Sequence, residues 1–171
     1  MTDSPIQAAI DCLRIHGVSV RQSSAWLAED HDPRFSPVEA YQPQFKHHVE
    51  RSYLMEVREA ETSYYVFRVF IGLGLRLLPV SPAREGEDPE KHEAGEAESD
   101  GVLAQIEATF VAEYDTDTDP GPEALEAFAQ RNASYHVWPY WREFVSNQCA
   151  RMELPRVVIP TVQFAVPADT Q

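Results

Sequence analysis

The sequence predicts an α+β fold, in which a four-stranded antiparallel sheet is followed by a C-terminal helix packed on one face. Three observations predict this fold class. Two long neighbouring segments, 45–58 and 63–78, alternate apolar and polar side chains with the period of two expected of strands. Two further strand-like segments, 13–26 and 102–114, lie before and after them. A helical pattern begins near Pro139, where proline is tolerated in a first turn.

The N-terminal part combines a short helical lead, one strand and a loop. Residues 1–12 are predicted as a short or frayed helix. The strand that follows carries Val18 and Val20, and Gly17 within it indicates a bend or a β-bulge. Residues 30–44 contain three prolines and are predicted as a loop.

The central pair of strands has the clearest pattern in the chain. In the first strand, odd positions hold the apolar side chains Phe45, Val49, Tyr53, Met55 and Val57. Only three residues break this alternation: His47, Arg51 and Leu54. In the second strand, odd positions hold Tyr65, Phe67, Val69, Ile71, Leu73, Leu75 and Leu77. The short turn between them, 59–62, predicts an antiparallel hairpin with one apolar face.

The second half of the chain is interrupted by an acidic segment and ends with the main helix. Residues 81–100 carry eight acidic side chains and almost no apolar ones, so we expect a disordered acidic loop within a single domain, 1–171. A small helix is predicted at 123–131. The main helix should run from Pro139 until Pro155 stops it, and an extended segment follows.

Composition restricts the classes of partner and the compartment. The net charge of −14 repels phosphate backbones and anionic headgroups, which argues against nucleic acid and membrane as partners. The N-terminus lacks a basic stretch followed by an apolar one, and the longest apolar stretch, 64–80, contains two arginines. Cys12 and Cys149 lie far apart in no metal or redox spacing. We therefore expect a cytoplasmic protein with free thiols.

No pattern of catalytic or metal-binding residues is visible. His47 and His48 are adjacent on a strand and should point to opposite faces, so they are not expected to hold one ion together. Gly72 and Gly74 lie inside a strand, where a close approach of another group explains them better than nucleotide binding. We expect no enzyme activity, no metal and no cofactor.

Aromatic residues are the remaining conspicuous feature. The chain has 3 Trp, 7 Tyr and 8 Phe, several of them within 135–144. Packing in the core explains such a cluster in most proteins. Alternatively, some of these rings line a groove that receives apolar side chains of a partner, because aromatic residues concentrate in recognition patches.

The segment 139–164 resembles the C-terminal part of the SecB family of protein-export chaperones. The matching pattern is Pro-Tyr, one residue, Arg-Glu, then an Arg, a Pro, alternating apolar residues and a final Phe. The positions that match are Pro139, Tyr140, Arg142, Glu143, Arg151, Pro155, Val157, Ile159 and Phe164. Pro160 comes one position earlier than the family proline. The upstream strand order fits as well, so the resemblance covers roughly residues 13–165.

The resemblance implies a SecB-like chaperone (a holdase) that forms a homotetramer, a dimer of dimers with helices packed between the two dimers. Its partners would be unfolded polypeptide clients bound along aromatic and aliphatic grooves. Six residues are candidates for this client-binding groove: Trp138, Tyr140, Trp141, Phe144, Tyr53 and Phe110. A structural oligomeric adaptor without clients is the alternative from another functional class.

Two departures from the export-type members concern the particular client. The acidic segment 81–100 is foreign to those members, and only seven residues follow Phe164, so we expect no second long helix. SecB-like chaperones of toxin–antitoxin systems share such features, which leaves both an export chaperone and an antitoxin-dedicated chaperone open. Binding to the motor protein SecA is uncertain, because the family's acidic contact positions align with Gly17, Arg21 and Gln105.

Overall fold

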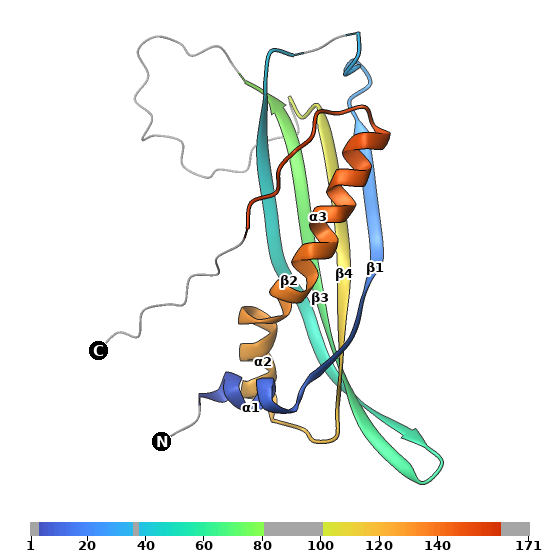
Figure 1. Cartoon of the computed structure of the whole chain (residues 1–171), viewed down its shortest axis with the longest axis vertical. Helices are drawn as coiled ribbons and strands as arrows, with labels where there is room; N and C mark the ends of the chain where they lie inside the picture. Colours follow the sequence, from blue (N-terminus) through green and yellow to red (C-terminus); the bar gives the residue numbers. More distant parts are fainter. Residues whose placement is uncertain (1–3, 36–37, 81–100, 162–171) are drawn as a thin grey trace, which may run out of the picture.

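The computed structural model describes residues 4–35, 38–80 and 101–161, which form one antiparallel sheet with helices on one face (Figure 1). The strand order is β1-β4-β3-β2. In chain order the elements are α1 (Pro5–Cys12), β1 (Arg14–Leu27), β2 (Tyr41–Glu59), β3 (Thr62–Pro79), β4 (Ala104–Thr116), α2 (Pro122–Arg131) and α3 (Ala133–Arg151). The predicted fold class is confirmed. The predicted acidic loop, 81–100, lies outside the described residues.

β3 and β4 form the centre of the core. Odd-numbered side chains of β3 and even-numbered side chains of β4 face the helices, and opposite pairs such as Ile71 and Phe110 pack together. Burying one such side chain contributes about 1.5–3 kcal/mol relative to leaving it exposed. The apolar odd-numbered face predicted for 63–78 is confirmed in β3, and the even-numbered residues of β4 complete it. The buried side chains on this face are Phe67, Val69, Ile71, Leu73, Leu75, Leu77, Ala104, Ile106, Ala108, Phe110, Ala112 and Tyr114.

β2 changes face halfway along its length. Its register with β3 shifts between Val49 and Arg51, where one strand contributes an extra residue. Beyond this shift, Leu54 lies opposite the buried Phe67, so even-numbered residues now face the helices. The prediction that the odd-numbered residues of 45–58 share one face is therefore wrong, because a single extra residue moves every later side chain to the other face. The hairpin itself and its turn are confirmed.

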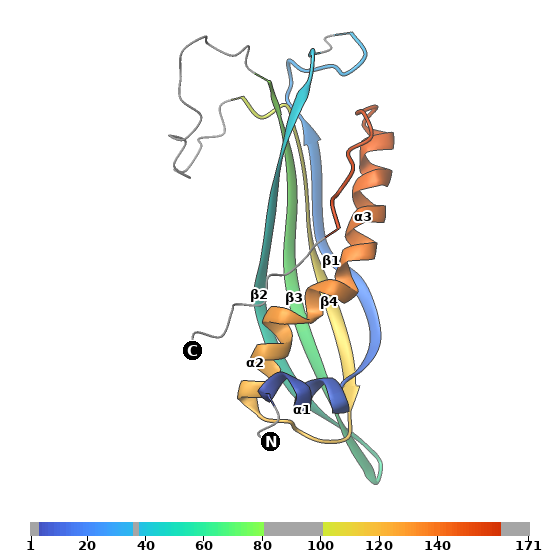
Figure 2. The same ribbon diagram turned by 60° about the vertical axis from the view of Figure 1, so that its left-hand side comes forward.

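α3 crosses the sheet obliquely and packs on β4, β3 and β1 (Figures 1 and 2). It begins at Ala133, so the prediction of a start near Pro139 is wrong. A proline inside a helix removes one backbone hydrogen bond. Burial of Ala133 and Val137 in the preceding turns offsets that loss. The stripe that faces the sheet recurs every fourth residue and consists of Val137, Trp141, Val145 and Cys149.

The other boundaries differ only at their ends from the sequence predictions. α1 and α2 pack against each other at the end of the sheet near the N-terminus (Figure 1). β2 begins at Tyr41, so the predicted loop 30–44 is shorter than expected. A register shift beside Gly17 confirms the predicted irregularity in β1. Within the three described ranges, no helix is long and apolar enough to cross a membrane.

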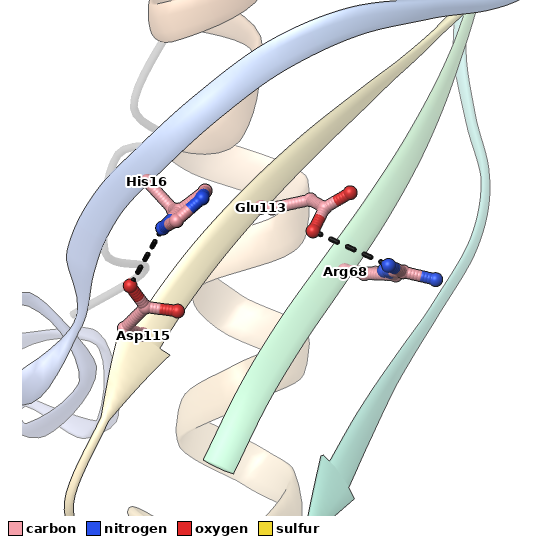
Figure 3. A network of polar contacts seen from close by, with 4 residues as sticks. All are labelled: His16, Arg68, Glu113 and Asp115. Atoms are coloured by element: carbon pink, nitrogen blue, oxygen red, sulfur yellow. Dashed lines mark hydrogen bonds and ion pairs between the residues drawn. The ribbon is translucent and has the colours of Figure 1, made fainter. Parts of the chain in front are cut away.

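The face of the sheet opposite the helices carries both apolar and polar side chains, and Val66, Phe70 and Val111 are buried on it. His16 Nδ1 lies 2.8 Å from Asp115 Oδ2, and Arg68 Nη2 lies 3.3 Å from Glu113 Oε2, with the helices behind the sheet (Figure 3). Gly72 leaves room on this face for a neighbouring imidazole, because a Cβ there would collide with the ring of His48. Close approach of another group therefore explains this glycine, as the sequence indicated.

Candidate functional site

Three of the six predicted groove residues belong to one aromatic cluster under α3. Trp141 is 1% exposed and Phe110 is 2% exposed, and their rings meet edge to face with centroids 6.3 Å apart. The half-buried Phe144 stacks on Trp141 at 6.1 Å. Trp141 and Phe110 are thus core residues in this structure, and their side chains do not line an open groove.

The other three predicted groove residues lie apart from this cluster and from one another. Trp138 contacts His47 of β2, with ring centroids 6.3 Å apart, and its Nε1 donates a hydrogen bond to the carbonyl oxygen of Pro160 at 2.9 Å. Tyr140 is 49% exposed on α3. Tyr53 lies beyond the register shift in β2 and packs on Phe70, on the face away from the helices. The structure therefore does not bring the six residues together in one groove.

A different apolar groove lies over the start of β2, and we name it the β2 groove. Its volume is about 490 Å³. The floor is the helix-side surface of β2 and β3, and the walls are the loop before β2 and the extended segment after α3. The lining residues are Val38, Glu39, Ala40, Tyr41, Pro43, Leu77, Pro155, Arg156, Val157 and Val158.

The direction of α3 leaves this groove open. At the first turn of α3, Ser134 Oγ lies 2.7 Å from His47 Nε2 on β2, so the helix starts close to that strand. Its later turns pack on β4 and β1, and the helix moves away from the start of β2 (Figure 1). Near this uncovered corner, Phe45 is 45% exposed and Val158 is 71% exposed. Apolar surface remains available there to a partner.

The wall formed by 155–161 is held in place by several contacts with α3. The amide of Leu154 donates to the carbonyl oxygen of Cys149 at 2.9 Å, which turns the chain back along the helix. Ile159 is buried in the core, and the Trp138 indole holds Pro160. Burial raises the pKa of the Cys149 thiol, and a hydrogen bond with the backbone of Val157 partly offsets this effect. The groove thus has a fixed wall.

The outer edge of β2 gives the groove a second means of binding a chain. β2 pairs only with β3 among the described strands, so the backbone groups on its other edge have no strand partner there. An extended peptide can add a strand at such an edge and place alternate side chains in a neighbouring pocket. Tyr41, Pro43 and Phe45 stand on the groove side at alternate positions of this strand.

Two histidines, His47 on β2 and His136 on α3, have lowered pKa values. Burial, and secondarily the charge of His48, lowers the pKa of His47. Burial also lowers the pKa of His136, whose Nδ1 lies 2.8 Å from the Tyr114 hydroxyl. Among the described residues, no group of three or more His, Cys, Asp or Glu side chains is placed to hold a metal ion.

Comparison with solved structures identifies the class of fold as SecB-like, as the sequence resemblance predicts. The Mycobacterium tuberculosis SecB-like chaperone Rv1957, in complex with a ChAD peptide from the Rv1956 HigA1 antitoxin, is similar with a TM-score of 0.66. The similarity covers 95% of this chain and 99% of that chain, at 16% sequence identity. No family model matches the sequence, and no curated protein does. The likeness is therefore one of fold.

The β2 groove was not predicted from the sequence, because the residues that line it show no clear strand or helix pattern. Pro43 marks the start of β2 as a loop, although proline is acceptable at the edge of a sheet. The alternation of Tyr41, Pro43 and Phe45 was the available signal. On the opposite wall, Val157 and Val158 lie in an extended segment that pairs with no strand among the described residues. The sequence pattern of this segment could not indicate which part of the sheet it lies against.

Proposed function

We propose that this protein is a non-enzymatic, cytoplasmic holdase that binds extended apolar segments of unfolded polypeptides in the β2 groove. One observation supports it most: an open apolar groove lies beside a strand edge that has no strand partner among the described residues, on a SecB-like fold. Unfolded chains expose both apolar side chains and free backbone groups, and this site can satisfy both. A chaperone of this kind stabilises the unfolded client by mass action. It requires no cofactor.

The proposed client class includes an antitoxin. The solved SecB-like chaperone of similar fold is bound to an antitoxin peptide. A dedicated client suits a groove of only about 490 Å³, which accepts a few side chains and not a long chain. A general role in protein export remains the alternative within the same class of function.

The proposed assembly is a homotetramer. The outer edge of β1 has no strand partner among the described residues, and β1 contains neither Pro nor Lys, which commonly protect such edges. Ile15, Val20 and Trp26 are exposed along this strand. β1 carries Arg14, Arg21 and two register shifts, so its regular stretch, 22–27, is where the edge can pair with a second copy of the chain.

The test compares one groove variant with one matched control. Val158→Glu puts a charge at the mouth of the groove, and Ile10→Glu puts the same charge on α1, away from the groove (Figure 1). Both positions are exposed, so both variants should keep their melting temperature. We expect Val158→Glu alone to lose suppression of aggregation of an unfolded test protein. Equal activity in both variants would place client binding elsewhere, and no suppression by the unaltered protein would favour the clientless adaptor.

A further inference from the structure

We propose that the exposed ring of Phe35 binds an apolar side chain of the client beside the β2 groove, so that the client is held by more residues than the groove itself accepts. This inference rests on the proposed function and extends its binding site. Among the described residues, the two most exposed large apolar side chains are Phe35, at 79%, and Val158, at 71%. Val158 lines the β2 groove, and Phe35 belongs to the loop that forms its other wall.

Two contacts place the turn that carries Phe35 at one end of the β2 groove. His31 is buried, and its Nε2 lies 3.0 Å from the hydroxyl oxygen of Tyr41, which lines the groove. On the other side, Arg34 Nε lies 3.5 Å from Glu153 Oε2, just before the wall that follows α3. The loop after β1 and the chain after α3 therefore meet at the end of the sheet that Figure 1 shows at the top.

The turn holds the backbone of Phe35 in place although the ring itself is exposed. Asp32 Oδ1 accepts hydrogen bonds from the backbone amides of Arg34 at 2.8 Å and of Phe35 at 3.1 Å, as in an Asx turn. The guanidinium carbon of Arg34 lies 5.4 Å from the centroid of the Phe35 ring. A side chain that is already positioned loses less entropy when it binds. Most of the ring remains accessible to a partner.

An extended client that leaves the β2 groove at this end passes within reach of the ring. The groove has a volume of about 490 Å³ and accepts a few side chains, so the flanking residues of the client lie outside it. Val38 lines the groove three residues after Phe35, so their Cα atoms are at most about 11 Å apart. An apolar client residue about three positions beyond the groove spans the same distance. Such a residue has an aromatic partner in Phe35, and aromatic side chains are enriched among the residues that dominate binding.

The experiment uses two synthetic peptides with the same core, in which Val and Thr alternate. One peptide carries Phe on both flanks of the core, and the other carries Ser at the same positions, so that either direction of binding is covered. Their affinities for the full-length protein are measured by fluorescence anisotropy. We expect the Phe-flanked peptide to bind about fivefold more tightly, which is the lower limit for a dominant contact.

Three variants assign this preference to Phe35 and its turn. Phe35→Ala should bind both peptides equally and keep its melting temperature, because the side chain is exposed. Tyr140→Ala is the matched control: it removes an exposed aromatic ring that does not line the β2 groove, and it should keep the preference. Asp32→Ala retains the ring but removes the turn, so the preference should fall to about twofold. Adding Asp32→Ala to Phe35→Ala should change nothing further, because the two residues act through one contact.

The outcomes separate this inference from the proposed function. Equal binding of the two peptides by the unaltered protein, a preference that persists in Phe35→Ala, or its loss in Tyr140→Ala would overturn the inference. The proposed function would stand in each case if Val158→Glu weakens binding of the Ser-flanked peptide. Undiminished binding of that peptide by Val158→Glu would contradict the proposed function, and binding of neither peptide by the unaltered protein would contradict both.

Discussion

Replacing Trp141 by Ala should destabilise the fold and leave the groove itself unchanged. Trp141 is 1% exposed, and its ring contacts both Phe110 and Phe144. A buried aromatic side chain removes about 150–250 Å² from water, which corresponds to about 4–6 kcal/mol. Partial collapse of the cavity lowers this loss, and comparable substitutions cost about 3–5 kcal/mol. We therefore expect the free energy of unfolding to fall by about 4 kcal/mol.

Denaturant unfolding at one fixed protein concentration measures this change, because an oligomer's apparent stability depends on concentration. For a chain of this size the melting temperature should fall by about 8–16 °C. Tyr140→Ala is the matched control: its side chain is 49% exposed, so we expect a loss of about 1 kcal/mol or less. If Trp141→Ala keeps its stability but loses peptide binding, Trp141 lines the client site and the assignment to the core is wrong.

Three further outcomes are expected. Burial lowers the pKa values of His47 and His136 in the folded state, so the free energy of unfolding should fall as the pH drops below about 6.5, the pKa of histidine in the unfolded chain. Exchanging both histidines for Gln should flatten this pH profile. An unchanged profile in the double variant would contradict the expectation. Light scattering should give about four times the chain mass of 19.4 kDa; a monomer would remove the proposed assembly. The isolated SecA tail should bind weakly, because Gly17, Arg21 and Gln105 supply no acidic contacts. Submicromolar one-to-one binding would overturn this expectation.

The sheet was predictable because the order of apolar and polar side chains along each strand is visible in the sequence. Helices cover one face of β3 and β4, so large apolar side chains recur at every second residue on that face, although Val66, Phe70 and Val111 are buried on the other face. β2 is an edge strand with a register shift, and a shift depends on pairing with β3, which a single strand's pattern does not contain. Leu54 was the visible sign of it. A residue that breaks the alternation in the middle of a strand can mark a β-bulge, after which the apolar side chains continue on the other parity of residue numbers.

The candidate site was harder to predict because nearby residues on a helix point in different directions. Successive residues of α3 are rotated by about 100°. Trp138 therefore faces β2, Trp141 faces the core and Tyr140 faces outward, although all three lie within one turn of the helix. Aromatic composition indicated a recognition surface. Only the position of α3 on the sheet, with the return of the chain after it, determines which side chains remain accessible.

The outer edges of β1 and β2, which have no strand partner in the part of the chain that the structure describes, suit different kinds of pairing. This difference links the proposed assembly to the proposed binding site. Proline lacks the N–H that a neighbouring strand requires, so Pro43 limits continuous pairing along the start of β2 to short stretches. β1 has no proline and runs without a register shift over 22–27, so it can pair over a longer continuous stretch. A long edge favours a permanent contact between identical chains, whereas a short edge beside an apolar groove favours contacts that form and dissociate. A holdase needs both, because it must stay assembled while its clients are released.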